Sequence, residues 1–259
     1  MKKILFATSL FSLLTLGAAP VFGQVVTSGT GTVTGSRFVS PGISNTAGMT
    51  SFRFGFTNSD HHIKGITALK STSGVNVNFQ DNDGNDPYKF ALRYNSLGSN
   101  VRTASFKNNE YCPGGTCTAK LPLSCDDQHI FVLTGFSFKY EEDDHQIKKI
   151  AVRRIADELE VTFGDDAKRT PYSWSAQYAI IPRANVRAAT RVSGNNPNGK
   201  ISFTRQAGTA FIQGFSFEFT NDKHHLKDFA VDLQTNQASF QDKNLDDPVR
   251  WSVEYAILR

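Results

Sequence analysis

One eighteen-residue segment recurs three times along this chain. It reads SFRFGFTNSDHHIKGITA at residues 51–68, GFSFKYEEDDHQIKKIAV at residues 135–152 and GFSFEFTNDKHHLKDFAV at residues 214–231. The first and third copies are identical at 8 of 18 positions without a gap. The chain therefore contains an internal repeat, and its fold must accommodate three similar units.

The repeated segment has the alternation of a β-strand. Phe52, Phe54 and Phe56 alternate with Arg53 and Gly55, so one face of this segment is apolar. The match with the second copy extends over residues 51–97 at a constant offset of 84. The third copy is offset by 163 through the His-His turn and by 161 from Phe240 onward. Because an even deletion preserves the face to which each side chain points, we expect a shortened hairpin loop and an unchanged core.

Further strands precede each matched core, which gives units of about 75 to 80 residues with five or six antiparallel strands. Propeller and trefoil repeats, at roughly 40 to 50 residues, are too short for this period. We predict an all-β fold of three tandem antiparallel β-sandwich modules, at residues 24–100, 101–182 and 183–259. The modules could surround a pseudo-threefold axis or form a string. Residues 24–50 are rich in Ser, Thr and Gly and predict only short strands, such as residues 31–33.

The first 23 residues have the organisation of a secretory signal peptide. Lys2 and Lys3 precede an apolar run over residues 4–16 and a small-residue region over residues 17–23. We therefore expect a secreted or periplasmic protein without a transmembrane segment, because no apolar run reaches about 18 residues. Removing the signal lowers the formal charge from +4 to +2, since two lysines are lost, and no basic run remains to predict nucleic-acid binding.

The three cysteines lie between the first two cores. In an oxidising compartment Cys112 and Cys117, which flank the Pro-Gly-Gly turn of CPGGTC, form the favoured disulfide, with pairing to Cys125 left open. A zinc site would need a fourth ligand.

The His-containing turn is the first candidate site. One interpretation is a histidine that caps the sandwich and bonds the acidic turn; a second is a three-histidine ion site on a pseudo-threefold axis, formed by His61, His145 and His224. The third is a polar ligand site used once per module. Its ligand-binding residues would be Asp60, His61, His62, Lys64, Asp144, His145, Lys148, Asp222, His224, His225 and Lys227.

The acidic loop that precedes the last strand of each core is the second candidate. Hard carboxylate and amide oxygens two or three residues apart suit Ca²⁺, although an ordinary polar hairpin loop has the same composition. The candidate calcium ligands are Asp81, Asp83, Asp86, Asp242, Asn244 and Asp246. Phe90, Trp174 and Trp251, in the last strand, lie on the apolar face and are expected to pack in the core.

The order of elements resembles the H-type lectin domain: an apolar strand, a polar turn, two further strands and a last strand of the form WSVEYAI. The resemblance implies small six-stranded sandwiches that assemble as trimers and bind N-acetylgalactosamine-like sugars, and it carries no binding residue over to this chain. Catalytic patterns such as Ser-His-Asp or paired carboxylates do not recur. We therefore expect an exported, non-enzymatic protein that binds a carbohydrate or another cell-surface ligand. The alternative is a structural, adhesive or toxin-associated surface protein that acts through protein contacts.

Overall fold

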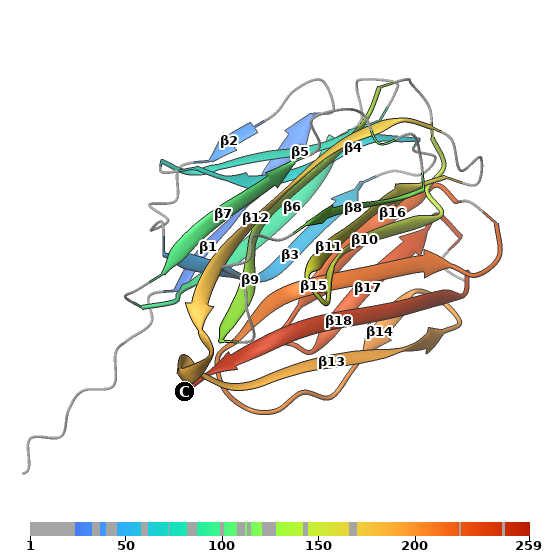
Figure 1. The fold of residues 1–259 in the computed structure, drawn as a ribbon. Coiled ribbons are helices and arrows are strands. Elements are labelled where there is room, and N and C mark those ends of the chain that lie inside the picture. Colours follow the sequence, from blue (N-terminus) through green and yellow to red (C-terminus); the bar gives the residue numbers. More distant parts are fainter. Residues whose placement is uncertain are drawn as a thin grey trace, which may run out of the picture.

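The computed structural model describes residues 24–32, 37–39, 46–57, 62–71, 73–81, 87–98, 101–107, 112, 115–120, 128–141, 145–165, 170–222, 224–244 and 247–259. Over these ranges the chain is almost entirely strand, which confirms the all-β prediction (Figure 1). The first repeat supplies β1 (Gln24–Thr32), β2 (Arg37–Val39), β3 (Ala47–Phe56), β4 (Ile63–Lys70), β5 (Val75–Asp81) and β6 (Pro87–Ser96). The second supplies β7 (Arg102–Lys107), β8 (Thr116–Lys120), β9 (His129–Tyr140), β10 (Lys149–Ile155), β11 (Glu158–Gly164) and β12 (Tyr172–Pro182). After the 3-10 turn η1 (Arg183–Asn185), the third supplies β13 (Val186–Asn196), β14 (Lys200–Ser202), β15 (Ala210–Phe219), β16 (Leu226–Asp232), β17 (Gln237–Asp242) and β18 (Val249–Leu258).

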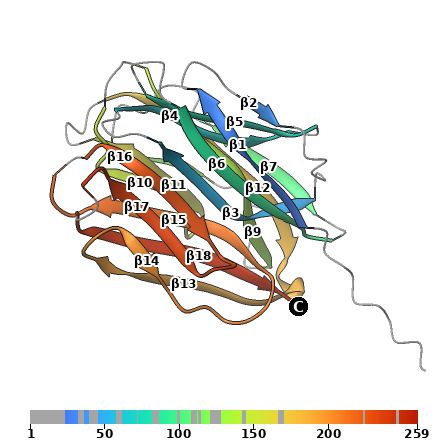
Figure 2. The same ribbon diagram turned by 180° about the vertical axis from the view of Figure 1, so that it is seen from behind.

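The strands form three six-stranded antiparallel sheets, and each sheet draws on two repeats. Sheet A has the order β1-β6-β3-β16-β17-β14, sheet B the order β2-β5-β4-β9-β12-β7, and sheet C the order β13-β18-β15-β10-β11-β8. In each sheet the first, third and sixth strands of one repeat continue into the second, fourth and fifth strands of another. Figure 2 shows this from behind, with the orange and red strands of the third repeat beside the blue β3.

The junctions at which one repeat bonds the next, here called seams, use the same register three times. Phe54 lies opposite Phe229 at the β3–β16 seam and Phe138 opposite Ile66 at the β9–β4 seam. Phe217 lies opposite Ile150 at the β15–β10 seam. These residues are equivalent under the repeat offsets, so the repeats are related by a pseudo-threefold axis and not strung out in a line.

Within a repeat, the three strands that belong to one sheet pack face to face against the three strands that belong to another. Phe56 on β3 stacks on Phe79 of β5 at 4.3 Å between ring centroids. The equivalent rings of the other repeats, Tyr140 with Phe163 and Phe219 with Phe240, lie 4.4 and 4.5 Å apart. Each repeat is thus a two-layer sandwich, but its layers belong to different hydrogen-bonded sheets. The expectation of separate modules missed this sharing, because the periodicity of a strand specifies its buried face and not the strand beside it.

Three equivalent phenylalanines meet on the axis. Phe52, Phe136 and Phe215 are fully buried, and their ring centroids are 5.1, 5.2 and 5.3 Å apart. Such tilted and edge-on contacts add about 0.5–1.5 kcal/mol per pair to the burial of the rings themselves. The three sheets therefore enclose one continuous aromatic core.

The last-strand aromatics are in the core as expected, since Phe90, Trp174 and Trp251 are 3%, 4% and 9% exposed. Strand β1 is longer than predicted: it spans nine residues and pairs with β6 along its whole length. Its Ser-, Thr- and Gly-rich composition predicted only short strands, whereas its backbone pairing with β6 extends over all nine residues.

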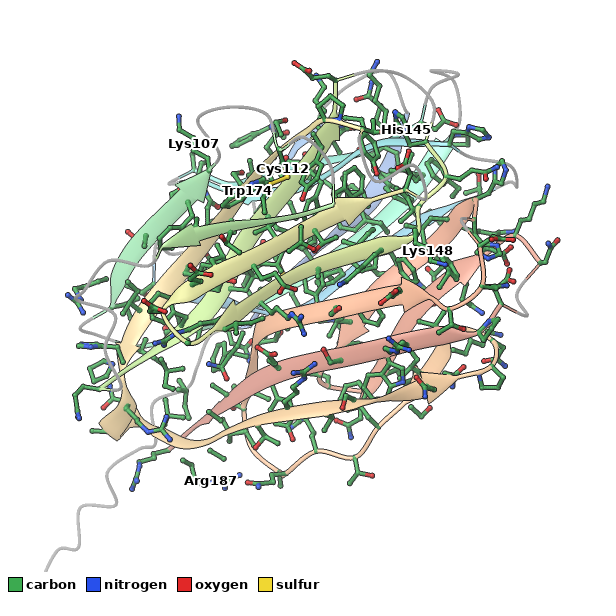
Figure 3. The ribbon with its side chains drawn as sticks, turned by 45° about the vertical axis from the view of Figure 1, so that its right-hand side comes forward. Lys107, Cys112, His145, Lys148, Trp174 and Arg187 are labelled. Atoms are coloured by element: carbon green, nitrogen blue, oxygen red, sulfur yellow. A yellow bond between two sulfur atoms is a disulfide. The ribbon has the colours of Figure 1, made fainter. Side chains whose placement is uncertain are left out.

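The chain has the Cys112–Cys117 disulfide, with the Cα atoms 6.2 Å apart. Backbone hydrogen bonds of 3.0 Å in both directions tie Cys112 to Tyr172, at the start of β12. The disulfide and these hydrogen bonds together therefore anchor the start of β8 to the core of the second repeat (Cys112 and Trp174 are labelled in Figure 3). Cys125 lies outside the described residues.

Candidate functional site

The three His-containing turns meet around one end of the pseudo-threefold axis. The amide of Ile63 donates to the carbonyl of His145 and the amide of Ile147 to that of His224, both at 2.9 Å. Ile63, Ile147 and Leu226 are fully buried below the turns. The His145 and His224 turns are therefore each bonded to a neighbouring repeat, and the polar side chains above these buried residues are brought together.

The second residue of each turn points to the axis. His62 and His225 have ring centroids 4.4 Å apart, and Nε2 of Gln146 lies 2.7 Å from Nε2 of His225. Because an amide nitrogen can only donate, Nε2 of His225 accepts in this arrangement. All three side chains are half-buried. They form a small polar cap that closes the end of the core.

The first residue of each turn instead engages an aspartate of its own repeat. His145 Nδ1 lies 3.0 Å from Asp165, and the Thr170 hydroxyl donates to the same carboxylate at 2.9 Å. His224 Nδ1 lies 3.4 Å from Asp242 and 3.1 Å from Asp247 (His145 is labelled in Figure 3). These contacts match the interpretation of a capping histidine and leave His145 and His224 turned toward separate partners, not toward a shared ion. His61, in the third copy of the position, lies outside the described residues.

The candidate calcium ligands divide into two groups. Asp81 and Asp242 end the fifth strand of their repeats and are 2% and 3% exposed. Asp242 accepts a hydrogen bond from the Asn244 amide at 2.8 Å, as in an ordinary polar turn. Asp83, Asp86 and Asp246 lie outside the described residues.

Among the described residues, His224, Asp242 and Asp247 form one group that could hold a metal ion, since their ligand atoms lie within 4.8 Å of one another. The amide oxygen of Asn221 lies 3.0 Å from His224 Nε2, and its amide nitrogen donates to Asp247 at 2.6 Å. Asn221 thus fixes the position of the imidazole ring. An imidazole and two carboxylates suit a transition metal better than calcium, which takes six to eight oxygens. Without an ion, the same three side chains form a polar cap over the end of the repeat.

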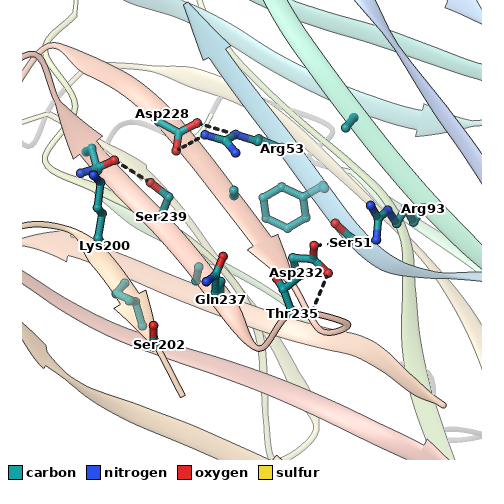
Figure 4. Close-up of a pocket in the computed structure, with 16 residues that line it drawn as sticks. Ser51, Arg53, Arg93, Lys200, Ser202, Asp228, Asp232, Thr235, Gln237 and Ser239 are labelled. Atoms are coloured by element: carbon teal, nitrogen blue, oxygen red, sulfur yellow. Dashed lines mark hydrogen bonds and ion pairs between the residues drawn. The ribbon is translucent and has the colours of Figure 1, made fainter. Parts of the chain in front are cut away.

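A hollowed polar surface lies elsewhere, on the outer face of sheet A (Figure 4). Three cross-strand rows run over this face from β6 toward β14. The first row is Lys89, Gly55, Asp228 and Gln241. The second is Ala91, Arg53, Ala230, Ser239 and Lys200. The third is Arg93, Ser51, Asp232, Gln237 and Ser202.

Small and long side chains alternate along these rows, and this hollows the face. Alanine, serine and glycine form the floor, and charged or amide side chains stand around it. The result is a groove with a volume of about 590 Å³, which continues into a second hollow of about 500 Å³ lined in addition by Lys227. These two hollows together are called the sheet A groove below.

Ion pairs across the β3–β16 seam hold the walls of the groove. The Arg53 guanidinium makes a two-pronged contact with Asp228, at 3.0 Å from Nε and 3.3 Å from Nη2. Arg93 lies 3.9 Å from Asp232. Gly55 makes room for this arrangement, because a Cβ there would lie 3.2 Å from the Asp228 carboxylate. The polar groups are therefore presented from rigid strands.

The equivalent faces of the other sheets differ. Where sheet A has Arg53, sheets B and C have Ser137 and Ser216, and where it has Asp228 they have Gly65 and Lys149. On sheet C, Arg153 pairs with Glu160 at 2.7 Å, and burial raises the pKa of Glu254 against the opposing effect of Arg191 and Arg153.

The predicted ligand residues thus separate in space. Lys227 lines the sheet A groove, and the Lys148 ammonium donates to the Asn221 carbonyl (Figure 3). Lys64 is half-buried and Asp222 is exposed. Asp60, His61 and Asp144 lie outside the described residues. Sequence reasoning missed Arg53, Asp228 and the rest of the groove because it searched for residues that recur, whereas these positions differ in each repeat.

No helix of the described residues is long and apolar enough to cross a membrane. No protein-family model matches this chain, and comparison with curated proteins finds no relative.

Proposed function

We propose that this protein is an exported, non-enzymatic binding protein that holds a carbohydrate in the sheet A groove. The observation that carries the proposal is the groove itself: hydrogen-bond donors and acceptors ordered in three rows over a floor of small residues. Sugars present hydroxyl groups that both donate and accept. A surface that alternates guanidinium, carboxylate, amide and hydroxyl groups can satisfy them together.

The rigidity of the groove supports binding as its role. Its side chains project from paired strands, so little conformational freedom is lost when a ligand is held. Both carboxylates of the groove, Asp228 and Asp232, are already in ion pairs with arginines. They are suited to accept hydrogen bonds from hydroxyl groups.

The adhesive alternative has less support in the described residues. Their exposed large hydrophobic side chains are Phe38 and Ile155, which lie on different sheets. Stable protein interfaces usually contain a contiguous apolar centre, and these two residues do not form one.

A glycan array with the mature protein tests the proposal. Ala91 lies in the floor of the groove, so Ala91→Trp should block it and abolish binding to the glycans that wild-type protein retains. The matched control is Ser175→Trp, at the equivalent half-buried position of sheet B, which should leave binding unchanged. Absence of binding to every glycan, or equal loss in both variants, would refute a carbohydrate site in this groove.

A further inference from the structure

The charges that line the sheet A groove do not balance. Five basic side chains face two acidic ones, which gives a formal excess of +3 (five minus two). The basic residues are Arg53, Lys89, Arg93, Lys200 and Lys227, and the acidic residues are Asp228 and Asp232. The mature chain carries a formal charge of only +2 by the sequence, so the excess is a local property of this face.

The excess lies on three lysines. Asp228 and Asp232 are occupied by Arg53 and Arg93. Lys89, Lys200 and Lys227 make no ion pair with any described residue. Clustered cations without counter-ions repel one another and raise the local concentration of anions. An anionic ligand would relieve this repulsion.

The lysines stand around the groove on separate strands. Lys89 is on β6, Lys227 on β16 and Lys200 on β14. With neighbouring strands about 4.8 Å apart, the backbones of β6 and β14 are separated by roughly 19 Å along the order β6-β3-β16-β17-β14. An extended ligand with several negative charges can reach all three, whereas a single small anion cannot.

The acceptors between the lysines decide which anion fits. Asp228, Asp232 and the exposed amide of Gln237 offer oxygen acceptors, to which a hydroxyl-rich ligand can donate. A nucleic acid backbone has few donors and would meet the two carboxylates with its phosphates. The aromatic rings of the lining, Phe52, Phe56 and Phe90, are 0%, 6% and 3% exposed, so no ring is offered for base stacking.

We propose that the ligand of the sheet A groove is an acidic oligosaccharide, with carboxylate or sulfate groups on its sugar rings. This inference rests on the proposed function and specifies its ligand class. The lysines contact the acid groups, while the Arg–Asp pairs and Gln237 bond the hydroxyl groups.

Titration calorimetry at low salt can test this with three probes: oligogalacturonate, chondroitin sulfate oligosaccharides and neutral dextran oligosaccharides. We expect at least one acidic probe to bind about tenfold more tightly than dextran, and to weaken as salt is raised. The triple variant Lys89→Gln, Lys200→Gln, Lys227→Gln should lose about tenfold in affinity for the acidic probe. The comparison between carboxylated and sulfated probes identifies the acid group.

A charge-matched control distinguishes binding at the groove from a general effect of the protein's net charge. Lys107→Gln, Lys139→Gln and Lys149→Gln remove three lysines from sheets B and C, and this variant should bind like the wild type. Equal weakening in both triple variants would overturn the inference. Neutral and acidic probes binding equally well would overturn it and leave the proposed carbohydrate function standing, whereas no binding to any saccharide would overturn both. Tighter, lysine-dependent binding of single-stranded DNA would replace the saccharide with a nucleic acid.

Discussion

Replacing the central phenylalanine of the first repeat should destabilise all three repeats at once. Phe52 is fully buried, and its ring centroid lies 4.9 Å from that of Phe229, 5.1 Å from Phe136 and 5.2 Å from Phe215. Phe→Ala changes in well-packed cores cost about 3–5 kcal/mol, and the loss of three ring contacts places Phe52→Ala in the upper part of that range. For a chain of this size, we expect the melting temperature to fall by roughly 10–20 °C.

The two tryptophans make the test specific. Trp174 and Trp251 are buried in the second and third repeats, so Trp251→Phe and Trp174→Phe variants each leave one reporter outside the mutated repeat. Because the seams share sheets between repeats, Phe52→Ala should lower the urea midpoint seen by both reporters equally. Phe38→Ala is the control: it removes the same ring from the same repeat at a 55% exposed position and should change the free energy of unfolding by less than about 0.5 kcal/mol. Reporters that keep their wild-type midpoints, or move by different amounts, would show that the repeats unfold independently.

Three further perturbations probe other parts of the molecule. Burial lowers the pKa of Lys70 from 10.5 to about 8, so the unfolded chain binds more protons between these values and the free energy of unfolding should rise with pH across that window. The difference between wild type and Lys70→Met, followed by urea unfolding from pH 7 to 10, isolates this slope, and a constant difference would contradict it. Replacing Cys112 and Cys117 by serine should cost about 2 kcal/mol in urea unfolding, as for closure of a loop with five-residue separation; an unchanged midpoint would mean that the unfolded chain gains no freedom. His224→Ala should cost about 1–3 kcal/mol because buried Asp242 loses a partner, and wild-type protein should melt at the same temperature with and without EDTA. A melting temperature that falls with EDTA would show that a metal ion joins these carboxylates.

The inward-facing half of the fold was predictable from the sequence. The alternation of Phe52, Phe54 and Phe56 and its two copies specify which side chains are buried, and the even two-residue deletion in the third repeat preserves that face. The pairing of strands was not predictable in the same way. A strand such as β4 has the same alternation whether it bonds to β3 of its own repeat or to β9 of the next, and in the structure it bonds to β9.

The candidate site was harder to predict for a related reason. The histidines recur in the sequence, and the two described ones, His145 and His224, each cap the same end of their repeat's core. Tyr140 and Phe219 pack against His145 and His224 at 4.1 and 4.5 Å between ring centroids, in equivalent positions. Recurrence therefore indicated packing. The groove depends on side chains that point outward at a seam, and their proximity follows from strand pairing between residues 175 positions apart, such as Arg53 and Asp228.

The seams also explain how three similar repeats assemble in one order. Ser51, Gly135 and Gly214 occupy equivalent positions. At each of them, a side chain from the last strand of one repeat reaches across the small residue and contacts the neighbouring repeat. Arg93 meets Asp232 over Ser51. Gln177 accepts from the Lys70 amide at 2.8 Å and donates to its carbonyl at 3.0 Å over Gly135.

At the third seam, Glu254 faces Arg153 over Gly214, with the charges reversed relative to sheet A. An exchange of partners would place Arg93 opposite Arg153 or Glu254 opposite Asp232, and like charges at this distance disfavour such pairings. The same divergence that makes each seam specific gives the sheet A groove its own set of charged side chains. Within one chain, the repeated inward residues build three equivalent sandwiches, and the unrepeated outward residues make one of their faces different from the others.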